Sequence, residues 1–308
     1  MSVIFVVLAC GLAGAVIAGA LAWFLPNFDP AAPRATQVVA HEAHAHPRIA
    51  GGLRSRFDPA NLTGLALTVA LAILLLGTIA IGVLLIMSQH NAGLARYDLS
   101  FARWGGDHAT PDSTRFLRDV SLLGGTPVMI AVALIAACWQ YARTRTLAIF
   151  GFLTVVVVGQ VLLTNLTKLL VDRARPDIHQ LTGFSGSSFP SGHAATAAAT
   201  FAAVALLVGR GRSRRTKAFL AAGAAFIAFS VATTRVLLGV HWFTDVLAGL
   251  AMGWACFAIA SIAFGGRVLR FGRPAEIAEE VSRADAVRAN DYVSVDAGGA
   301  ARESTFGG

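Results

Sequence analysis

Seven long apolar stretches dominate this chain and limit what it can fold into. A helix that crosses a bilayer needs about 20 mostly apolar residues, and lipid offers no partner to an unpaired backbone group. Of the 308 residues, 56% are hydrophobic and 14% are charged, whereas a soluble domain carries about 25% charged residues. The sequence therefore predicts an all-α, polytopic membrane helix bundle. Its expected spans are 2–25, 62–87, 122–141, 147–167, 192–209, 218–234 and 246–264, with the sixth continuing past Arg235 toward Gly239.

The spans divide the chain into four parts. We expect an N-terminal transmembrane helix at 1–25, a cytoplasmic linker at 26–61, a six-helix core at 62–265, and a partly disordered cytoplasmic tail at 266–308. No Lys or Arg precedes the first span, as it would in most signal peptides, so we interpret it as a retained helix with its N-terminus outside.

The linker contains three closely spaced histidines, His41, His44 and His46. A His-rich segment can bind a metal ion, but no cysteine or cluster of carboxylates completes a site nearby. We therefore favour a solvated, flexible linker, and the sequence predicts no metal site and no cofactor.

Lys and Arg in short loops predict the orientation, because they are enriched on the cytoplasmic side. The connection 210–217 has five basic residues in eight and no acidic one. Counting spans from it places Arg143 and Arg145, the linker and the C-terminus on the same side. We expect a multi-pass plasma-membrane protein whose formal net charge of +8 reflects this topology and not nucleic acid binding.

The loop 88–121 has aromatic and apolar residues at spacings of three and four, which is typical of an amphipathic helix. We expect this helix to lie on the outer membrane surface. It could cover a site there, but interfacial anchoring is the preferred interpretation.

Three short polar segments lie at the outer ends of apolar spans. In the first, Lys168 and Arg175 are seven positions apart, about two helical turns, so both can project from one side of a continuing helix. Arg235 adds a guanidinium from another helix, and guanidinium donors match two phosphate oxygens at once. Each of these residues alone could merely reach for lipid headgroups. Together they predict a phosphate site.

The second segment, 188–193, opens the fifth span with Ser191, Gly192 and His193. The first N–H groups of a helix lack intrahelical partners and bind anions. Gly192 allows close approach of the backbone, Ser191 can donate its hydroxyl or cap the helix, and His193 lies one residue deeper, where it could reach a leaving oxygen.

The third segment, 234–245, places His241 and Asp245 four residues apart, on one face of a helix that starts near His241. Asp245 can accept a hydrogen bond from one ring nitrogen and leave the other nitrogen free to attack phosphorus. A structural His–Asp pair is the alternative.

As a set, these segments resemble the signature strings of the type-2 phosphatidic acid phosphatase superfamily. Those strings are Lys-x6-Arg-Pro, Pro-Ser-Gly-His and Ser-Arg-x5-His-x3-Asp, and they fall here between Lys168 and Asp245, about a quarter of the chain. Thr234 stands where the family usually has Ser. The first span and the linker lie outside the resemblance.

The resemblance implies a role for each site residue. His241 would form a phosphohistidine, Asp245 would orient it, and His193 would protonate the leaving oxygen and later activate water. The implied phosphate ligands are Lys168, Arg175, Ser191, Gly192 and Arg235, with no metal required.

We therefore predict a bacterial membrane phosphatase with an extracytoplasmic active site. Its substrate would be a phospholipid or a polyprenyl phosphate such as undecaprenyl pyrophosphate, and which one is left open, as is the oligomeric state. Two alternatives are a vanadate-dependent haloperoxidase-like enzyme, and a lipid transporter or scramblase that binds headgroups at the charged site.

Overall fold

The predicted helix bundle is confirmed by a computed structural model, which describes residues 2–24 and 62–268. Every regular element in these residues is helical, and seven of the helices are long and apolar enough to cross a membrane. These seven are α1 (Val3–Phe24), α4 (Leu62–Gln89), α7 (Thr126–Thr144), α8 (Ala148–Val171), α9 (Gly192–Gly209), α10 (Arg214–Leu237) and α11 (Phe243–Val268). The predicted linker at 26–61 and nearly all of the predicted tail lie outside the described residues.

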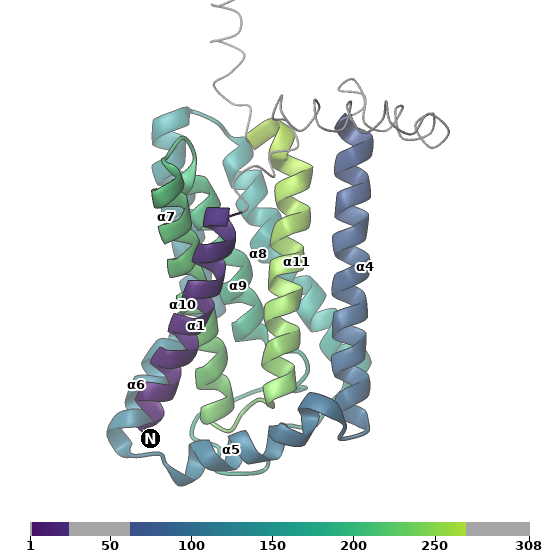
Figure 1. The fold of residues 1–308 in the computed structure, drawn as a ribbon, viewed down its shortest axis with the longest axis vertical. Helices are drawn as coiled ribbons and strands as arrows, with labels where there is room; N and C mark the ends of the chain where they lie inside the picture. Colours follow the sequence, from purple (N-terminus) through teal and green to yellow (C-terminus); the bar gives the residue numbers. More distant parts are fainter. Residues whose placement is uncertain (1, 25–61, 269–308) are drawn as a thin grey trace, which may run out of the picture.

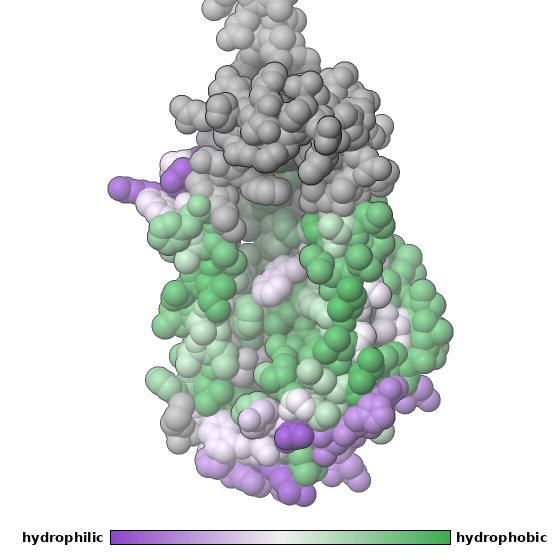
Figure 2. All heavy atoms as spheres, turned by 45° about the vertical axis from the view of Figure 1, so that its right-hand side comes forward, coloured by the Kyte–Doolittle hydropathy of each residue, from purple (hydrophilic) through white to green (hydrophobic). Residues whose placement is uncertain are grey.

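The seven long helices run side by side, and successive ones point in opposite directions, whereas α5 (Asp98–Asp107) lies across one end of the bundle (Figure 1). As a result, the three polar segments and the connection from α4 to α7 meet at one end of the bundle. The basic connection between α9 and α10 lies at the opposite end. A broad band of apolar side chains covers the middle of the face shown in Figure 2, and hydrophilic residues gather at the end that carries the polar segments. We call this end the site end.

The connection from α4 to α7 forms three short helices, where a single amphipathic helix was predicted. They are η2 (Gly93–Tyr97), α5 (Asp98–Asp107) and α6 (Pro111–Leu122). Pro111 lacks a backbone N–H, so it cannot continue the helix that precedes it. Instead, Thr110 caps the start of α6 in a capping box with Ser113. Leu117 is fully buried and Asp98 is 4% exposed, so this segment packs onto the bundle and does more than anchor it in the interface.

The third predicted span begins too early. Residues 122–125 form the end of α6 and a turn, and α7 starts at Thr126, with Pro127 at a position where proline fits the first helical turn. Leu122 and Leu123 are apolar and join the predicted span, whereas Gly124, Gly125 and Pro127 are the residues that mark the break.

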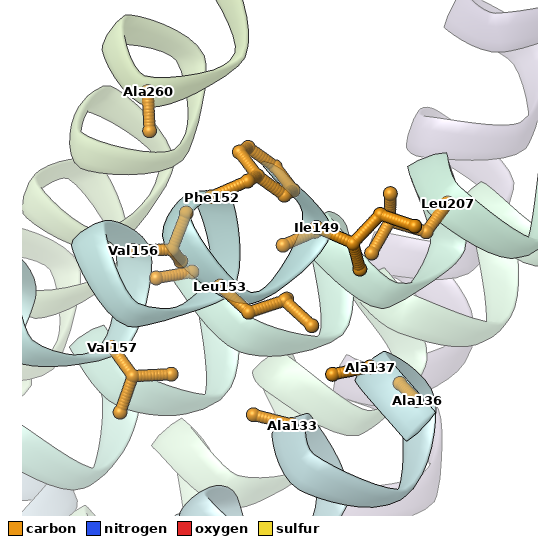
Figure 3. Packing of buried hydrophobic residues seen from close by; sticks show 12 residues of the cluster. Ala133, Ala136, Ala137, Ile149, Phe152, Leu153, Val156, Val157, Leu207 and Ala260 are labelled. Carbon is orange, nitrogen blue, oxygen red and sulfur yellow. The ribbon is translucent and has the colours of Figure 1, made fainter. Parts of the chain in front are cut away.

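Two clusters of buried residues hold the bundle together around α9. In the first, shown in Figure 3, side chains of α8 such as Phe152 and Val156 fill the space between α7, α9 and α11. In the second, α9 packs against α10 and α11 through small residues such as Ala194 and Ala198. Small side chains let the backbones approach closely, which is common between membrane helices.

The contact between α9 and α11 depends on two glycines one turn apart. A Cβ at Gly249 would lie 2.5 Å from the carbonyl oxygen of Ser191, and one at Gly253 would lie 2.2 Å from that of Ala195. These obstacles are backbone atoms, which cannot turn away as a side chain could. The close approach at Gly249 sets the start of α9 directly beside the start of α11.

We expect Gly253→Ala to destabilise the protein by about 1–3 kcal/mol or more, because its methyl group would force α9 and α11 apart. Thermal unfolding in detergent micelles measures this. Gly223→Ala on α10 is the matched control, since a Cβ there meets no atom within 4 Å, and its stability should be unchanged or slightly higher. Equal unfolding temperatures for the two variants would contradict the packing argument.

The N-terminal helix α1 lies along α10, and its first turns reach the site end. Val3 and Val7 are buried in a cluster with Leu237, the last residue of α10, and with Leu238 and Val240 of the turn that precedes α11. The sequence placed α1 outside the family resemblance and assigned no contact to it. The structure shows that α1 packs against the turn between α10 and α11.

Candidate active site

The three polar segments converge at the site end, as predicted. From the first segment, Arg175 Nη1 donates a hydrogen bond to Val240 O at 2.7 Å and lies 3.2 Å from Nε2 of His241, in the third segment. From the second, the backbone N–H of Ser191 donates to the carbonyl oxygen of Asp245 at 2.9 Å. His193, in the first turn of α9, lies close enough to Arg235, His241, Lys168 and Arg175 to interact electrostatically with each of them.

His241 is 2% exposed and Asp245 is fully buried. His241 Nδ1 lies 3.5 Å from Asp245 Oδ2 and makes no hydrogen bond within the described part of the chain. The nearby carboxylate favours the tautomer with a proton on Nδ1, which leaves a lone pair on Nε2, the atom that faces Arg175. Burial lowers the pKa of His241 to about 4, although the nearby Asp245 carboxylate raises it, so the ring is neutral near pH 7.

One detail of this pair differs from the prediction. The helix α11 begins at Phe243, so His241 lies in the turn before it and not on the helix. Asp245 still reaches back, because its Oδ2 also accepts a hydrogen bond from the backbone N–H of Trp242 at 2.9 Å. A residue at the third helical position often caps the helix start in this way.

Arg175 lies beyond the end of α8, in an irregular segment, and a loop holds its guanidinium in place. Its Nε donates to Gly186 O at 2.9 Å, and its Nη2 donates to Ser185 O at 2.9 Å and Ser187 O at 3.1 Å. Burial lowers the pKa of Arg175 below its ordinary value, but a guanidinium stays protonated in proteins. The loop 185–187 therefore presents a fixed cation to Nε2 of His241.

Two buried donors at the site have no hydrogen-bond acceptor among the described residues. They are the Ser191 hydroxyl and Nε of Arg235. Arg235 is 6% exposed, and its Nη1 donates to Ser121 Oγ at 2.8 Å. Buried polar groups are almost always paired in folded proteins, so these two donors indicate a place for an anionic ligand. Gly192 opens α9 beside them, which adds the free N–H groups of a helix start.

Charge points to the same ligand. Lys168, in the last turn of α8, interacts electrostatically with Arg175, Asp245 and Arg235. Arg173 forms ion pairs with Asp98 and Asp245 in the same cluster. With neutral histidines, these four cations and two carboxylates leave a net charge of +2. A phosphate monoester carries about −1.5 to −2 at pH 7, so it would neutralise the site.

Five polar residues in or beside the site were not assigned a role from sequence: Asp98, Ser121, Arg173, Ser188 and Thr244. Arg173 was detectable in principle, because it is a basic residue at the end of a span, two positions before Arg175. Asp98 and Ser121 belong to the connection between α4 and α7. Nothing in their local sequence marks them, because their partners lie more than 70 residues away.

These features define a helical membrane protein with a buried histidine–aspartate pair in a cationic, anion-binding site. Residues 148–268, which contain all three polar segments, match the PAP2 superfamily. Phosphatidylglycerophosphatase B of Bacillus subtilis is 30% identical over 157 residues, which make up 49% of this chain and 75% of that protein. The chain belongs to the PAP2 superfamily.

Two further relatives complete the comparison. Lipid A 1-phosphatase of Rhizobium etli is 40% identical over 129 residues, 36% of this chain and 51% of that protein. The chain thus matches only about half the length of this relative and of a second lipid A 1-phosphatase, from Rhizobium johnstonii. The crystal structure of a transmembrane PAP2-type phosphatidylglycerolphosphate phosphatase from Bacillus subtilis aligns with a TM-score of 0.56 at 25% identity, and covers 66% of this chain and 98% of that one.

Proposed function

We propose that this protein is a phosphatase that removes a phosphate group from a membrane lipid through a phosphohistidine intermediate. One observation carries the proposal. The uncharged Nε2 of a buried histidine faces a fixed guanidinium, beside the unpaired donors of Ser191 and Arg235. Catalysis of phosphoryl transfer is largely a matter of positioning and of stabilising charge on the phosphoryl oxygens. The relatives named above support a lipid phosphate as the substrate.

In the proposed reaction, His241 Nε2 attacks phosphorus while the bond from phosphorus to the lipid oxygen breaks. His193, which takes up a proton when the anionic substrate binds, gives this proton to that oxygen, so that the lipid leaves as an alcohol or a shorter phosphate. Water then attacks the phosphohistidine, His193 takes a proton from this water, and phosphate leaves His241 restored. Lys168, Arg175 and Arg235 stabilise the oxygens of the transferred group, and Asp245 stabilises the Nδ1 proton of His241.

Phosphate release is the direct test of this proposal. The purified protein in micelles should release phosphate from lipid phosphates in the presence of EDTA, because every proposed role belongs to a side chain or a backbone N–H group of the protein. A panel of lipid A, phosphatidate, phosphatidylglycerol phosphate and undecaprenyl pyrophosphate should contain at least one substrate that is turned over well above the rest. Release that stops in EDTA and returns with a divalent cation would contradict the metal-independent reaction.

We also propose that the site faces the extracytoplasmic side of the membrane. Supporting this, the basic connection 210–217 lies at the other end of the bundle, where the positive-inside rule predicts the cytoplasm. A variant without Cys10, Cys138 and Cys256 allows single-cysteine labelling. In intact spheroplasts, an impermeant maleimide should label Thr114→Cys on α6 and not Ser213→Cys. The reverse pattern would place the site in the cytoplasm.

A further inference from the structure

Arg173 joins all three polar segments to the surface helix α5. Its Nη1 donates to Thr244 Oγ1 at 2.8 Å and to Asp245 Oδ1, and its Nη2 donates to Asp98 Oδ2 at 2.8 Å. Its backbone carbonyl accepts from the N–H of Ser188 at 2.8 Å, at the start of the second segment. Its side chain also lies over the ring of Trp242. One residue of the first segment thus contacts both of the others.

Asp98 also contacts this cluster, although it lies outside residues 148–268, which match the family. Its Oδ1 accepts from the backbone N–H of Thr244 at 2.9 Å, and its Oδ2 accepts from the Thr244 hydroxyl at 2.8 Å. The first turn of α11 is therefore held by a carboxylate from another helix, which suits the positive end of the helix dipole. Asp98 is 4% exposed, so the arginine is its compensating charge.

The two oxygens of Asp245 have separate partners. Oδ1 accepts from Arg173, whereas Oδ2 accepts from Trp242 N and the Ser188 hydroxyl and faces Nδ1 of His241. Arg173 thus contacts the oxygen that His241 does not use, and within the described residues no hydrogen bond or ion pair joins it to a proposed phosphate ligand. Removing it would leave two buried carboxylates, Asp98 and Asp245, without the cation between them, which is strongly unfavourable.

We propose that Arg173, held by Asp98, is a positioning residue that fixes the Asp245 carboxylate so that Oδ2 holds the Nδ1 proton of His241. The Nε2 lone pair then points at phosphorus. The chemical part of this proposal rests on the proposed function. The tautomer and orientation that it predicts for His241 do not depend on any substrate.

The kinetic test separates positioning from phosphate binding. Arg173→Gln should lower kcat by about 10- to 100-fold, the loss seen when a residue that orients a metal-binding side chain is replaced, and should leave KM within about twofold. Arg235→Gln should raise KM, because it removes a phosphate donor. Arg115→Gln, an exposed arginine of α6, is the matched control and should match the unmodified protein. A large rise in KM for Arg173→Gln would overturn the proposal.

A double-mutant cycle tests whether Arg173 acts through Asp245. In an Asp245→Asn background, Arg173→Gln should cost less than about threefold further, because the carboxylate it positions is already gone. Losses that multiply would mean that Arg173 acts by another route. If Arg173→Gln does not fold, Asp98→Asn and Arg173→Lys give the same cycle, and Arg173→Lys should recover part of kcat by retaining the charge.

Spectroscopy tests the geometry without relying on activity. In substrate-free protein labelled with ¹⁵N-histidine, the His241 signals, assigned with a His241→Gln variant, should report a single tautomer protonated at Nδ1. Arg173→Gln and Asp98→Asn should populate the other tautomer, whereas Arg115→Gln should not. An unchanged tautomer in both variants would overturn the positioning role, even if the unmodified protein proved to release no phosphate.

Discussion

Replacing His241 with alanine is expected to abolish phosphate release, with a loss on the order of 10⁴-fold or more, as when other covalent nucleophiles are removed. Without its ring nitrogen no phosphoenzyme can form, and the three cations can only bind the substrate. A radiolabelled substrate quenched in mid-turnover should leave an acid-labile, base-stable phosphoenzyme in the unmodified protein and none in His241→Ala.

His179→Ala is the matched control for this experiment. His179 is also at the site end, but it is more than half exposed and faces Asp107 on α5 at 3.6 Å. We expect its variant to keep activity within about twofold, as for most exposed sites. Full turnover by His241→Ala, or a base-labile acyl phosphate in its place, would refute the assignment of the nucleophile.

Replacing His193 with alanine should slow lipid turnover by about 10²- to 10⁴-fold, the usual contribution of a general acid and base. The size of the loss should depend on the leaving group. A lipid alkoxide needs a proton to leave, whereas p-nitrophenolate leaves readily without one. With p-nitrophenyl phosphate, His193→Ala should therefore still form the phosphohistidine and hydrolyse it slowly, because His193 also activates water.

Rapid-quench measurement distinguishes the two steps. The His193 variant should show a burst of p-nitrophenol followed by slow turnover, with the phosphoenzyme accumulating. If the variant shows no burst and an equal loss with both substrates, His193 is not the acid, and its contribution is limited to binding. The same protocol with His241→Ala should give no burst, which keeps the two histidines distinguishable.

The helix bundle was predictable to within a few residues, because lipid requires a continuous apolar helix wherever the chain crosses it. The fifth span was predicted with both of its ends correct, at Gly192 and Gly209. The third began too early, because Leu122 and Leu123, at the end of α6, lie next to the apolar span. Gly124, Gly125 and Pro127 mark the turn in the sequence, but a window of hydropathy includes the two leucines in the span.

The site was predictable where a single residue's chemistry marks it. Buried cations and histidines at span ends are costly, so Lys168, Arg175, Arg235, His193 and His241 stood out. Their convergence at one end is now visible, while their roles in catalysis stay predictions. Asp98 and Ser121 carried no such mark, because polar residues are ordinary in a surface loop and only the packing of α5 and α6 buries them.

The sequence by itself determined the class of fold, the number of spans and the inventory of charged groups, because these follow from local composition and from the cost of polar atoms in lipid. The tertiary structure alone decided which charges neutralise one another. It assigned Arg173 to two carboxylates, left the Arg235 Nε and the Ser191 hydroxyl without a hydrogen-bond partner among residues 2–24 and 62–268, and set α1 behind the turn that carries His241. Electrostatic pairing depends on distance in space, and contacts between residues far apart in the chain set that distance.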